Sequence, residues 1–137
     1  RATRTPSVPR PAHIVVAIDG PAASGKSSTA HWVAGKLGYR HVDSGALYRA
    51  VTALALAEGG PAEGWREGGL RALAERVSLV PVEGGFEPRV GGHPIGEAIR
   101  GPEVTRHVSR VAQMPAIRAW VNERVREAGA HHDVVVD

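Results

Sequence analysis

The residues of this chain that could do chemistry begin with a glycine-rich stretch between an apolar run and a helical pattern. Eight residues, Gly20–Ser27, have the sequence Gly-Pro-Ala-Ala-Ser-Gly-Lys-Ser. This spacing is typical of a phosphate-binding loop, because its glycines allow a tight turn that aims successive backbone N–H groups at phosphate oxygens. The positive end of the dipole of the following helix adds to that attraction. The stretch therefore predicts a binding site for the phosphates of a nucleotide.

Two side chains of this loop have predicted chemical roles. Lys26 is expected to reach the β- and γ-phosphates as a catalytic cation, and the Ser27 hydroxyl is expected to ligate Mg²⁺. The alternative, an ordinary glycine-rich turn, does not account for the strand pattern before the loop and the helix pattern after it. The predicted nucleotide-binding residues are Gly20, Pro21, Ala22, Ala23, Ser24, Gly25, Lys26, Ser27 and Ser28.

A second polar stretch, Asp43–Arg49, follows the next apolar segment and begins another helical pattern. Ligands bind at the carboxyl ends of the strands in an open parallel sheet, so this stretch should face the phosphate loop. Arg49 is suited to hold a second phosphate, because its guanidinium can donate two parallel hydrogen bonds. Tyr48 is expected beside it, with packing as the alternative role. Asp43 or Ser44 caps the helix, and Asp43 is alternatively a ligand.

The elements that position these residues follow from the hydrophobic pattern. The β-branched run over residues 13–18 predicts a buried strand, and a helix over about 26–37 ends with Gly38 as its cap. A short second strand is predicted over 39–42, directly before the next helix. A strand, a helix and a strand in so few residues imply a parallel, right-handed crossover.

The middle of the chain departs from this alternation. A short helix is predicted over 70–77, and residues Ser78–Ile95 then predict a small antiparallel meander. Pro81 and Pro88 favour edge strands, because proline cannot donate to a ladder of hydrogen bonds. We interpret the meander as an insertion beside the nucleotide-binding core.

The remaining elements return to the first pattern. Pro102 and Pro115 each begin a predicted helix, the second helix ends at Gly129, and a third buried strand covers 134–137. The predicted fold class is α/β, with a parallel sheet of the P-loop NTPase type, flanking helices and the small antiparallel insert. The predicted nucleotide-binding core covers residues 13–137, with the insert over about 60–100.

The composition restricts the function classes. The chain has no cysteine, which excludes disulfides and thiol chemistry, and no apolar run approaches the roughly 20 residues of a membrane span. Arg1, Arg4 and Arg10 lie in a proline-rich leader over residues 1–12, which we expect to be disordered. Without these three arginines the acidic and basic residues balance in number. We expect no nucleic-acid or membrane partner, and a monomer in the cytoplasm.

A phosphate loop alone does not separate kinases, GTPases and motor ATPases. The second strand follows the first helix too closely for a GTPase switch loop, and Asp43–Arg49 offers groups that recognise an anion and a hydroxyl. Both features favour a small-molecule kinase, in which two phosphate-bearing substrates meet in line. The alternatives are a kinase with another acceptor, such as shikimate or another nucleoside monophosphate, and a non-catalytic nucleotide-binding module.

These stretches resemble the corresponding parts of the bacterial cytidylate kinases. The resemblance is carried by Ile18–Ser28, by Asp43–Arg49 and by the later segment 99–118, and it covers everything but the leader. The meander occupies the position of the distinctive substrate-domain insert of these kinases. The resemblance implies that ATP donates its γ-phosphoryl group to CMP or dCMP in the presence of Mg²⁺.

The resemblance also implies which residues hold the acceptor nucleotide. Arg49 would bind the α-phosphate, and Ser109 and Arg118 would recognise the cytosine and its sugar. Arg100 would add a positive charge near the nucleotide. The alternatives are a solvated helix charge at Arg118 and an ordinary helix serine at Ser109. The predicted acceptor-binding residues are Ser44, Gly45, Tyr48, Arg49, Arg100, Ser109 and Arg118.

The sequence differs from this family after Asp137, where the family continues with a Gly-Arg-Asp loop, further strands and a mobile lid. Those parts supply additional arginines for the transferred phosphoryl group. We therefore expect the chain of 137 residues to be truncated relative to the family, and to be inactive or feeble by itself.

Overall fold

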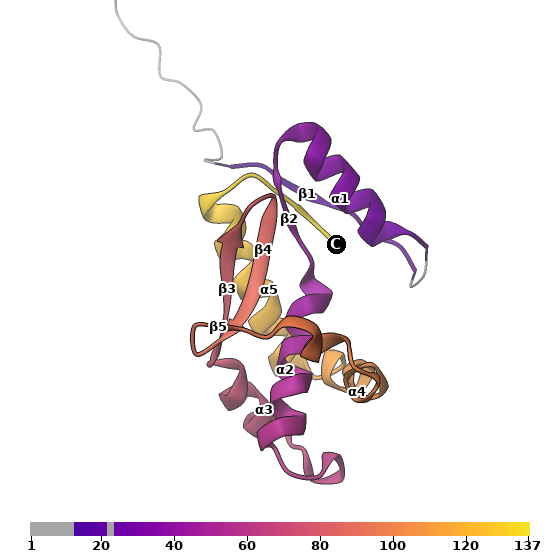
Figure 1. Cartoon of the computed structure of the whole chain (residues 1–137), viewed down its shortest axis with the longest axis vertical. Helices are drawn as coiled ribbons and strands as arrows, with labels where there is room; N and C mark the ends of the chain where they lie inside the picture. Colours follow the sequence, from indigo (N-terminus) through magenta and orange to yellow (C-terminus); the bar gives the residue numbers. More distant parts are fainter. Residues whose placement is uncertain (1–12, 22–23) are drawn as a thin grey trace, which may run out of the picture.

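The structure is a computed structural model that describes residues 13–21 and 24–137. It confirms the α/β class, with a mostly parallel sheet and flanking helices (Figure 1). The predicted leader, residues 1–12, lies outside the described residues, as do Ala22 and Ala23 of the phosphate loop.

Three short parallel strands form the part of the sheet that carries the phosphate loop. They are β1 (Val15–Ala17), β2 (Arg40–Val42) and β6 (Val134–Val136). The strand β6 lies between the other two, although it comes last in the chain. Strands are present at all three predicted positions, but the prediction that the first strand is buried was wrong. β1 is an edge strand of the sheet, and the side chain of Val15 is 53% exposed. The pairing of β1 with β6 places β6 directly beside the strand that precedes the phosphate loop.

The alternating side chains of β6 explain why helices cover both faces of these strands. Val135 packs with Ala30 and Ala34 of α1 (Lys26–Leu37), whereas Val134 packs with Ala128 of α5 (Pro115–His131). Successive residues of a strand point to opposite faces, so one valine run supports a helix on each side. The helix α1 ends as predicted, because Gly38 adopts the left-handed conformation with φ 71°.

The hairpin forms the other end of the sheet. It consists of β3 (Val77–Val82) and β4 (Gly85–Val90), with the two-residue strand β5 (His93–Pro94) beside β4. The antiparallel meander is confirmed, and the predicted short helix ends before it, because Val77 already belongs to β3. Within the described residues, the strands thus form one six-stranded sheet in the order β1-β6-β2-β4-β3, with β5 paired to β4.

Two predictions about the hairpin were wrong. The hairpin continues the core sheet instead of lying beside it, because β4 pairs in parallel with β2 through Gly85 and His41. A Cβ atom at Gly85 would stand 3.1 Å from the carbonyl oxygen of His41, so glycine permits this close pairing. Pro88 also lies in an interior strand. It is tolerated there because β2 pairs only at Gly85, and β5 only at Arg89 and Val90.

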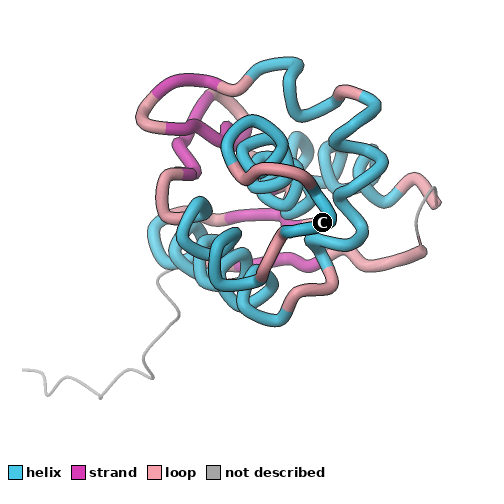
Figure 2. The backbone as a smooth tube through the Cα atoms, turned by 90° about the horizontal axis from the view of Figure 1, so that it is seen from below, coloured by secondary structure: helices cyan, strands magenta, loops and turns pink. Residues whose placement is uncertain are grey.

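Helices fill the part of the molecule below the sheet in Figure 1 and lie on both sides of the central strands in Figure 2. The long helix α2 (Ser44–Glu58) packs against α3 (Glu67–Ala74), α4 (Pro102–Ala112) and α5, and two short 3₁₀ helices cover Ala62–Gly64 and Gly96–Arg100. The apolar side of α2 faces the core, because Leu47, Ala50 and Val51 are fully buried. The start of α2 therefore has a fixed position relative to the sheet. No helix of the described chain is long and apolar enough to span a membrane.

The predicted end of α5 was wrong. Gly129 lies inside the helix, which continues to His131. A Cβ atom at Gly129 would stand 2.7 Å from Cγ2 of Val15 on β1, far closer than side chains approach one another. Gly129 therefore permits a close contact between α5 and β1. It does not cap the helix, as its position near the helix end had suggested.

Candidate functional site

A cavity of about 560 Å³ lies where the phosphate loop meets the beginning of α2. It is at the carboxyl ends of the parallel strands, where ligands bind in sheets of this kind. The cavity is lined by Gly25, Lys26, Ser27, Ser28, Asp43, Ser44, Gly45, Tyr48, Arg49 and Asp137. The two stretches that the sequence analysis singled out thus share one cavity.

One wall of the cavity is the first turn of α1. Gly25 is the residue before the helix, and its φ of 82° is the left-handed conformation that glycine adopts without strain. Lys26, Ser27 and Ser28 follow within the first turn, where the backbone N–H groups have no partner inside the helix. This wall can therefore bind an anion, as predicted from the loop sequence.

The earlier residues of the loop turn the chain toward this wall. Ser24 donates its backbone N–H to the carbonyl of Pro21 at 3.2 Å. A Cβ atom at Gly20 would stand 3.0 Å from Oγ of Ser24. A side chain at position 20 would thus crowd the turn that brings Gly25 to the start of α1.

The opposite wall is the first turn of α2. Asp43 is the residue before this helix, and its side chain makes no capping hydrogen bond. A Cβ atom at Gly45 would stand 3.0 Å from Oδ1 of Asp43 and 3.3 Å from Nη1 of Arg49. The carboxylate and the guanidinium therefore both approach the space that a side chain at position 45 would occupy. Both groups line the cavity, so Asp43 remains available as a ligand.

Tyr48 connects the cavity to a further predicted residue. Its side chain lines the cavity, and burial raises the pKa of its hydroxyl above the ordinary value of 10.0. The nearby guanidinium of Arg118 opposes this rise, because a positive charge favours the tyrosinate. Arg118 lies on α5, 70 residues after Tyr48, so the fold brings two predicted acceptor-binding residues together.

Three predicted acceptor-binding residues, Arg100, Ser109 and Arg118, do not line the cavity itself. Arg100 ends the second 3₁₀ helix and Ser109 lies on α4, and the side chains of all three are exposed. The helices α4 and α5 both pack against α2. These residues thus belong to elements that border the start of α2, outside the part of the site nearest to the phosphate loop.

Sequence reasoning missed one residue of the cavity, Asp137, which follows β6. Its side chain is 4% exposed and lies 2.5 Å from Nε2 of His41 on β2. Its backbone carbonyl accepts hydrogen bonds from the Oγ of Ser44 at 2.6 Å and from the N–H of Ser44 at 3.0 Å. An acidic residue directly after an apolar strand was the available signal, since strand ends face the site.

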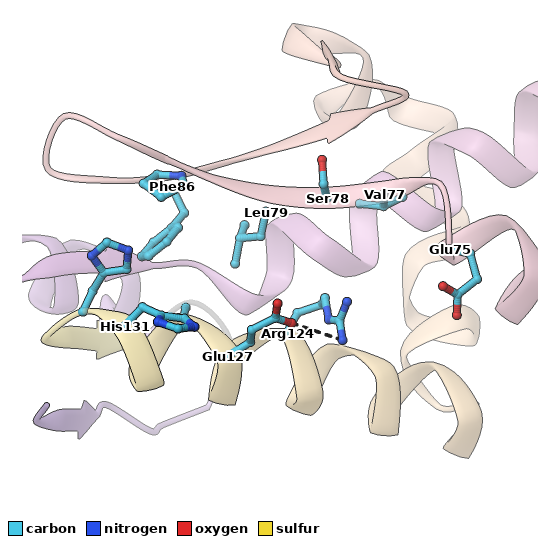
Figure 3. A pocket seen from close by; sticks show the side chains of 11 residues that line it. Glu75, Val77, Ser78, Leu79, Phe86, Arg124, Glu127 and His131 are labelled. Carbon is cyan, nitrogen blue, oxygen red and sulfur yellow. Dashed lines mark ion pairs between the residues drawn. The ribbon is translucent and has the colours of Figure 1, made fainter. Parts of the chain in front are cut away.

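A second cavity, of about 380 Å³, lies between the hairpin and α5 (Figure 3). Leu79 and Phe86 line it from the hairpin, and Arg124 and Glu127 face them from α5 as an ion pair 3.2 Å apart. None of the predicted site residues lines this cavity. The cavity at the phosphate loop therefore remains the candidate site.

Comparison with known proteins agrees with this geometry. The family model described as cytidylate kinase matches residues 16–137, which include both walls of the cavity and Asp137. The chain belongs to the cytidylate kinase family. The match confirms the family that the phosphate loop and the Asp43–Arg49 stretch indicated.

Individual members of the cytidylate kinase family are similar over most of this chain. The cytidylate kinase of Thermus thermophilus is 45% identical over 115 residues, which are 82% of this chain and 54% of that protein. The cytidylate kinase of Limosilactobacillus fermentum is 39% identical over 127 residues, 90% of this chain and 54% of that protein. The chain thus spans about half the length of these curated relatives.

A similar sequence also forms part of a longer protein. The bifunctional pantoate ligase/cytidylate kinase of Synechococcus sp. (strain JA-3-3Ab) is 40% identical over 137 residues, 96% of this chain and 25% of that protein.

Proposed function

We propose that the protein is a phosphotransferase that moves the γ-phosphoryl group of ATP to CMP or dCMP, giving ADP and CDP or dCDP. The observation that carries the proposal is that one cavity has the phosphate loop on one wall and Arg49 with its neighbours on the other. The names of the similar proteins support the choice of cytidine nucleotides.

The donor nucleotide is proposed to lie on the α1 wall. The free backbone N–H groups at the start of α1 would hold the β- and γ-phosphates of ATP, with the Lys26 ammonium beside them. Phosphoryl transfer is chiefly a matter of positioning and charge neutralisation, so cations at this wall are the protein's main contribution. Gly20, Pro21 and Ser24 shape the loop and need not touch the nucleotide with their side chains.

The acceptor nucleotide is proposed to lie on the α2 wall. Arg49 would hold the α-phosphate of CMP, whose oxygen attacks the γ-phosphorus of ATP while the bridging oxygen leaves with ADP. Ser44, Gly45 and Tyr48 line the same wall. The position of the Arg49 guanidinium next to Gly45 aims this cation into the cavity and not away from it.

Recognition of the base is proposed to involve Arg118 and Ser109, with Arg100 adding positive charge nearby. Arg118 reaches Tyr48, a residue of the cavity, which places a guanidinium at the border of the acceptor wall. Cytosine has acceptors at N3 and O2, which a guanidinium and a hydroxyl can pair with. A side chain that pairs with these atoms favours cytosine over bases that lack them.

The residues of the cavity also fit Mg²⁺. The Ser27 hydroxyl and the carboxylates of Asp43 and Asp137 line it, and oxygen atoms are the donors that Mg²⁺ prefers. Mg²⁺ in phosphoryl-transfer sites is held by one or two carboxylates together with substrate phosphates, so this donor set suffices. We propose that Ser27 and Asp137 hold the ion, which would neutralise charge on the donor phosphates when bound.

The remaining predictions concern the state of the protein. We propose a cytoplasmic monomer that takes small-molecule nucleotides and no nucleic acid. Because the chain spans about half the length of its curated relatives, we propose that these 137 residues alone catalyse phosphoryl transfer slowly or not at all.

The proposal is tested by measuring ADP formation by the full-length protein with Mg²⁺, ATP and one acceptor at a time. CMP and dCMP are expected to support turnover far above UMP, AMP and shikimate. Preference for another acceptor would assign the site to a different kinase. ATP binding with no acceptor-dependent ADP formation would instead indicate a nucleotide-binding module.

A further inference from the structure

The carboxylate of Asp137 has a partner on the neighbouring strand that the sequence analysis did not assign to the site. Nε2 of His41, in the middle of β2, lies 2.5 Å from Oδ1 of Asp137, the residue that follows β6. The side chains are 14% and 4% exposed, respectively. An ionised carboxylate can only accept, so Nε2 of His41 carries the proton and donates it to Oδ1.

The surroundings hold both residues in place. The backbone N–H of Asp137 donates to the carbonyl of Val42 at 3.1 Å, and its carbonyl accepts from Ser44, so the backbone cannot reorient the side chain. The ring of His41 meets that of His31 on α1 edge-on, with centroids 5.7 Å apart. Rotation of the Asp137 side chain itself is thus the remaining freedom, and the hydrogen bond from His41 removes it.

Only one oxygen of this carboxylate is used by His41. Among residues 13–21 and 24–137, no side chain forms a hydrogen bond with Oδ2 of Asp137. Asp137 also lines the cavity at the phosphate loop. A carboxylate with one oxygen held by an imidazole and the other available is the arrangement that orients a metal ligand.

We infer that His41 is a positioning residue, which holds the Asp137 carboxylate so that its second oxygen serves the Mg²⁺ of the donor nucleotide. This inference rests on the proposed function. His41 touches neither nucleotide and acts through Asp137. Without the imidazole, the nearly buried carboxylate would lack its partner and turn toward whatever donor or water it can reach.

The test compares two polar substitutions that differ in reach. In H41Q the side-chain amide can occupy the position of Nε2 and donate to Asp137, whereas the amide of H41N is one methylene shorter and falls near Nδ1. H31L is a matched control, because it removes the imidazole that contacts His41 and leaves the hydrogen bond to Asp137. Calorimetry measures the dissociation constant of ATP for the full-length protein and each variant, with Mg²⁺ and with EDTA.

The quantity of interest is the gain in ATP affinity that Mg²⁺ produces. This gain is expected to be about tenfold smaller in H41N than in the unsubstituted protein, as is common when the partner of a metal ligand is removed. Its affinity for ATP in EDTA should be unchanged. H41Q and H31L are expected to keep most of the gain.

Two results would overturn the inference. One is a Mg²⁺-dependent gain in H41N equal to that of the unsubstituted protein, and the other is an equal loss in H41N and H41Q. A double variant checks the route: H41N added to D137N should reduce the gain no further, and an additional loss would also contradict an action through Asp137. If the unsubstituted protein fails to bind ATP, the proposed function itself fails, which is a distinct outcome.

Discussion

The guanidinium of Arg49 lies against the backbone of Gly45, so that a Cβ atom at Gly45 would stand 3.3 Å from Nη1 of Arg49. Side chains of a helix point back toward its N-terminus, which brings residue 49 over residue 45 in the first turns of α2. The cavity with the phosphate loop begins at this turn. The position of Arg49, the proposed acceptor-binding cation, thus depends on the absence of a side chain one turn earlier.

Substitution of Gly45 by alanine is expected to weaken use of the acceptor without weakening the fold. The new methyl group would displace the ends of the Arg49 and Asp43 side chains by a few tenths of an ångström, and both can move. We expect KM for CMP to rise about tenfold, because small misplacements of a positioning group are costly. KM for ATP and the urea midpoint of unfolding are the controls. An unchanged KM for CMP would contradict the role of this turn.

The pKa of Tyr48 provides a test of its contact with Arg118. Burial raises the pKa of Tyr48 above 10.0 and Arg118 opposes that rise, so R118A should raise the pKa further. Ultraviolet absorbance of the tyrosinate measures this pKa, in a Y39F background that removes the other tyrosine of the chain. A lower pKa in R118A would show that the guanidinium does not face the hydroxyl.

The same shift makes a prediction about stability at high pH. The folded protein keeps the Tyr48 proton to a higher pH than the unfolded chain, whose tyrosine titrates near 10. The contribution of Tyr48 is therefore complete below that pH and is lost as the pH rises through the folded-state pKa. The free energy of unfolding of Y48F should decrease less steeply above pH 10 than that of the unsubstituted protein. Equal slopes would contradict a raised pKa of Tyr48 in the folded protein.

Two glycines within helices are expected to respond in opposite ways to alanine. At Gly129 of α5 the added methyl group would meet Cγ2 of Val15 at 2.7 Å, so G129A should destabilise the protein by about 1–3 kcal/mol. At Gly35 of α1 nothing lies within 4 Å of the new atom, so G35A should stabilise it by about 0.5–1 kcal/mol through helix propensity. Urea unfolding measures both. A stabilising G129A would show that α5 does not pack this closely on β1.

Much of the fold follows from signals that are local in the sequence. The cap at Gly38 and the helix starts at Pro102 and Pro115 each depend on residues within one turn of one another, and the structure confirms all three. The phosphate loop was predicted from a similarly short stretch, Gly20–Ser27. The buried side of α2 also follows from helical spacing alone. Such features need no knowledge of the partner segments.

The features that could not be predicted depend on which strands pair. His41 and Asp137 are 96 residues apart in the chain and meet only because β6 lies between β1 and β2. The pairing of β4 with β2 has the same origin, since it joins Gly85 to His41. Glycine often ends a helix, but Gly129 is inside α5 because the helix packs closely on Val15 of the distant strand β1. The periodicity of the sequence does not indicate which strands pair or which distant residues come into contact.

The central claim is that two nucleotides occupy opposite walls of one cavity, and it is tested most directly by calorimetry with CMP and with ATP on R49A and K26A. We predict that R49A lowers the affinity for CMP by about 1.5–3 kcal/mol, the usual contribution of a charged hydrogen bond, and leaves ATP binding unchanged. We predict that K26A weakens ATP binding and leaves CMP binding unchanged. If both substitutions weakened both nucleotides equally, or if R49A left CMP binding intact, the division of the cavity into a donor wall and an acceptor wall would be wrong.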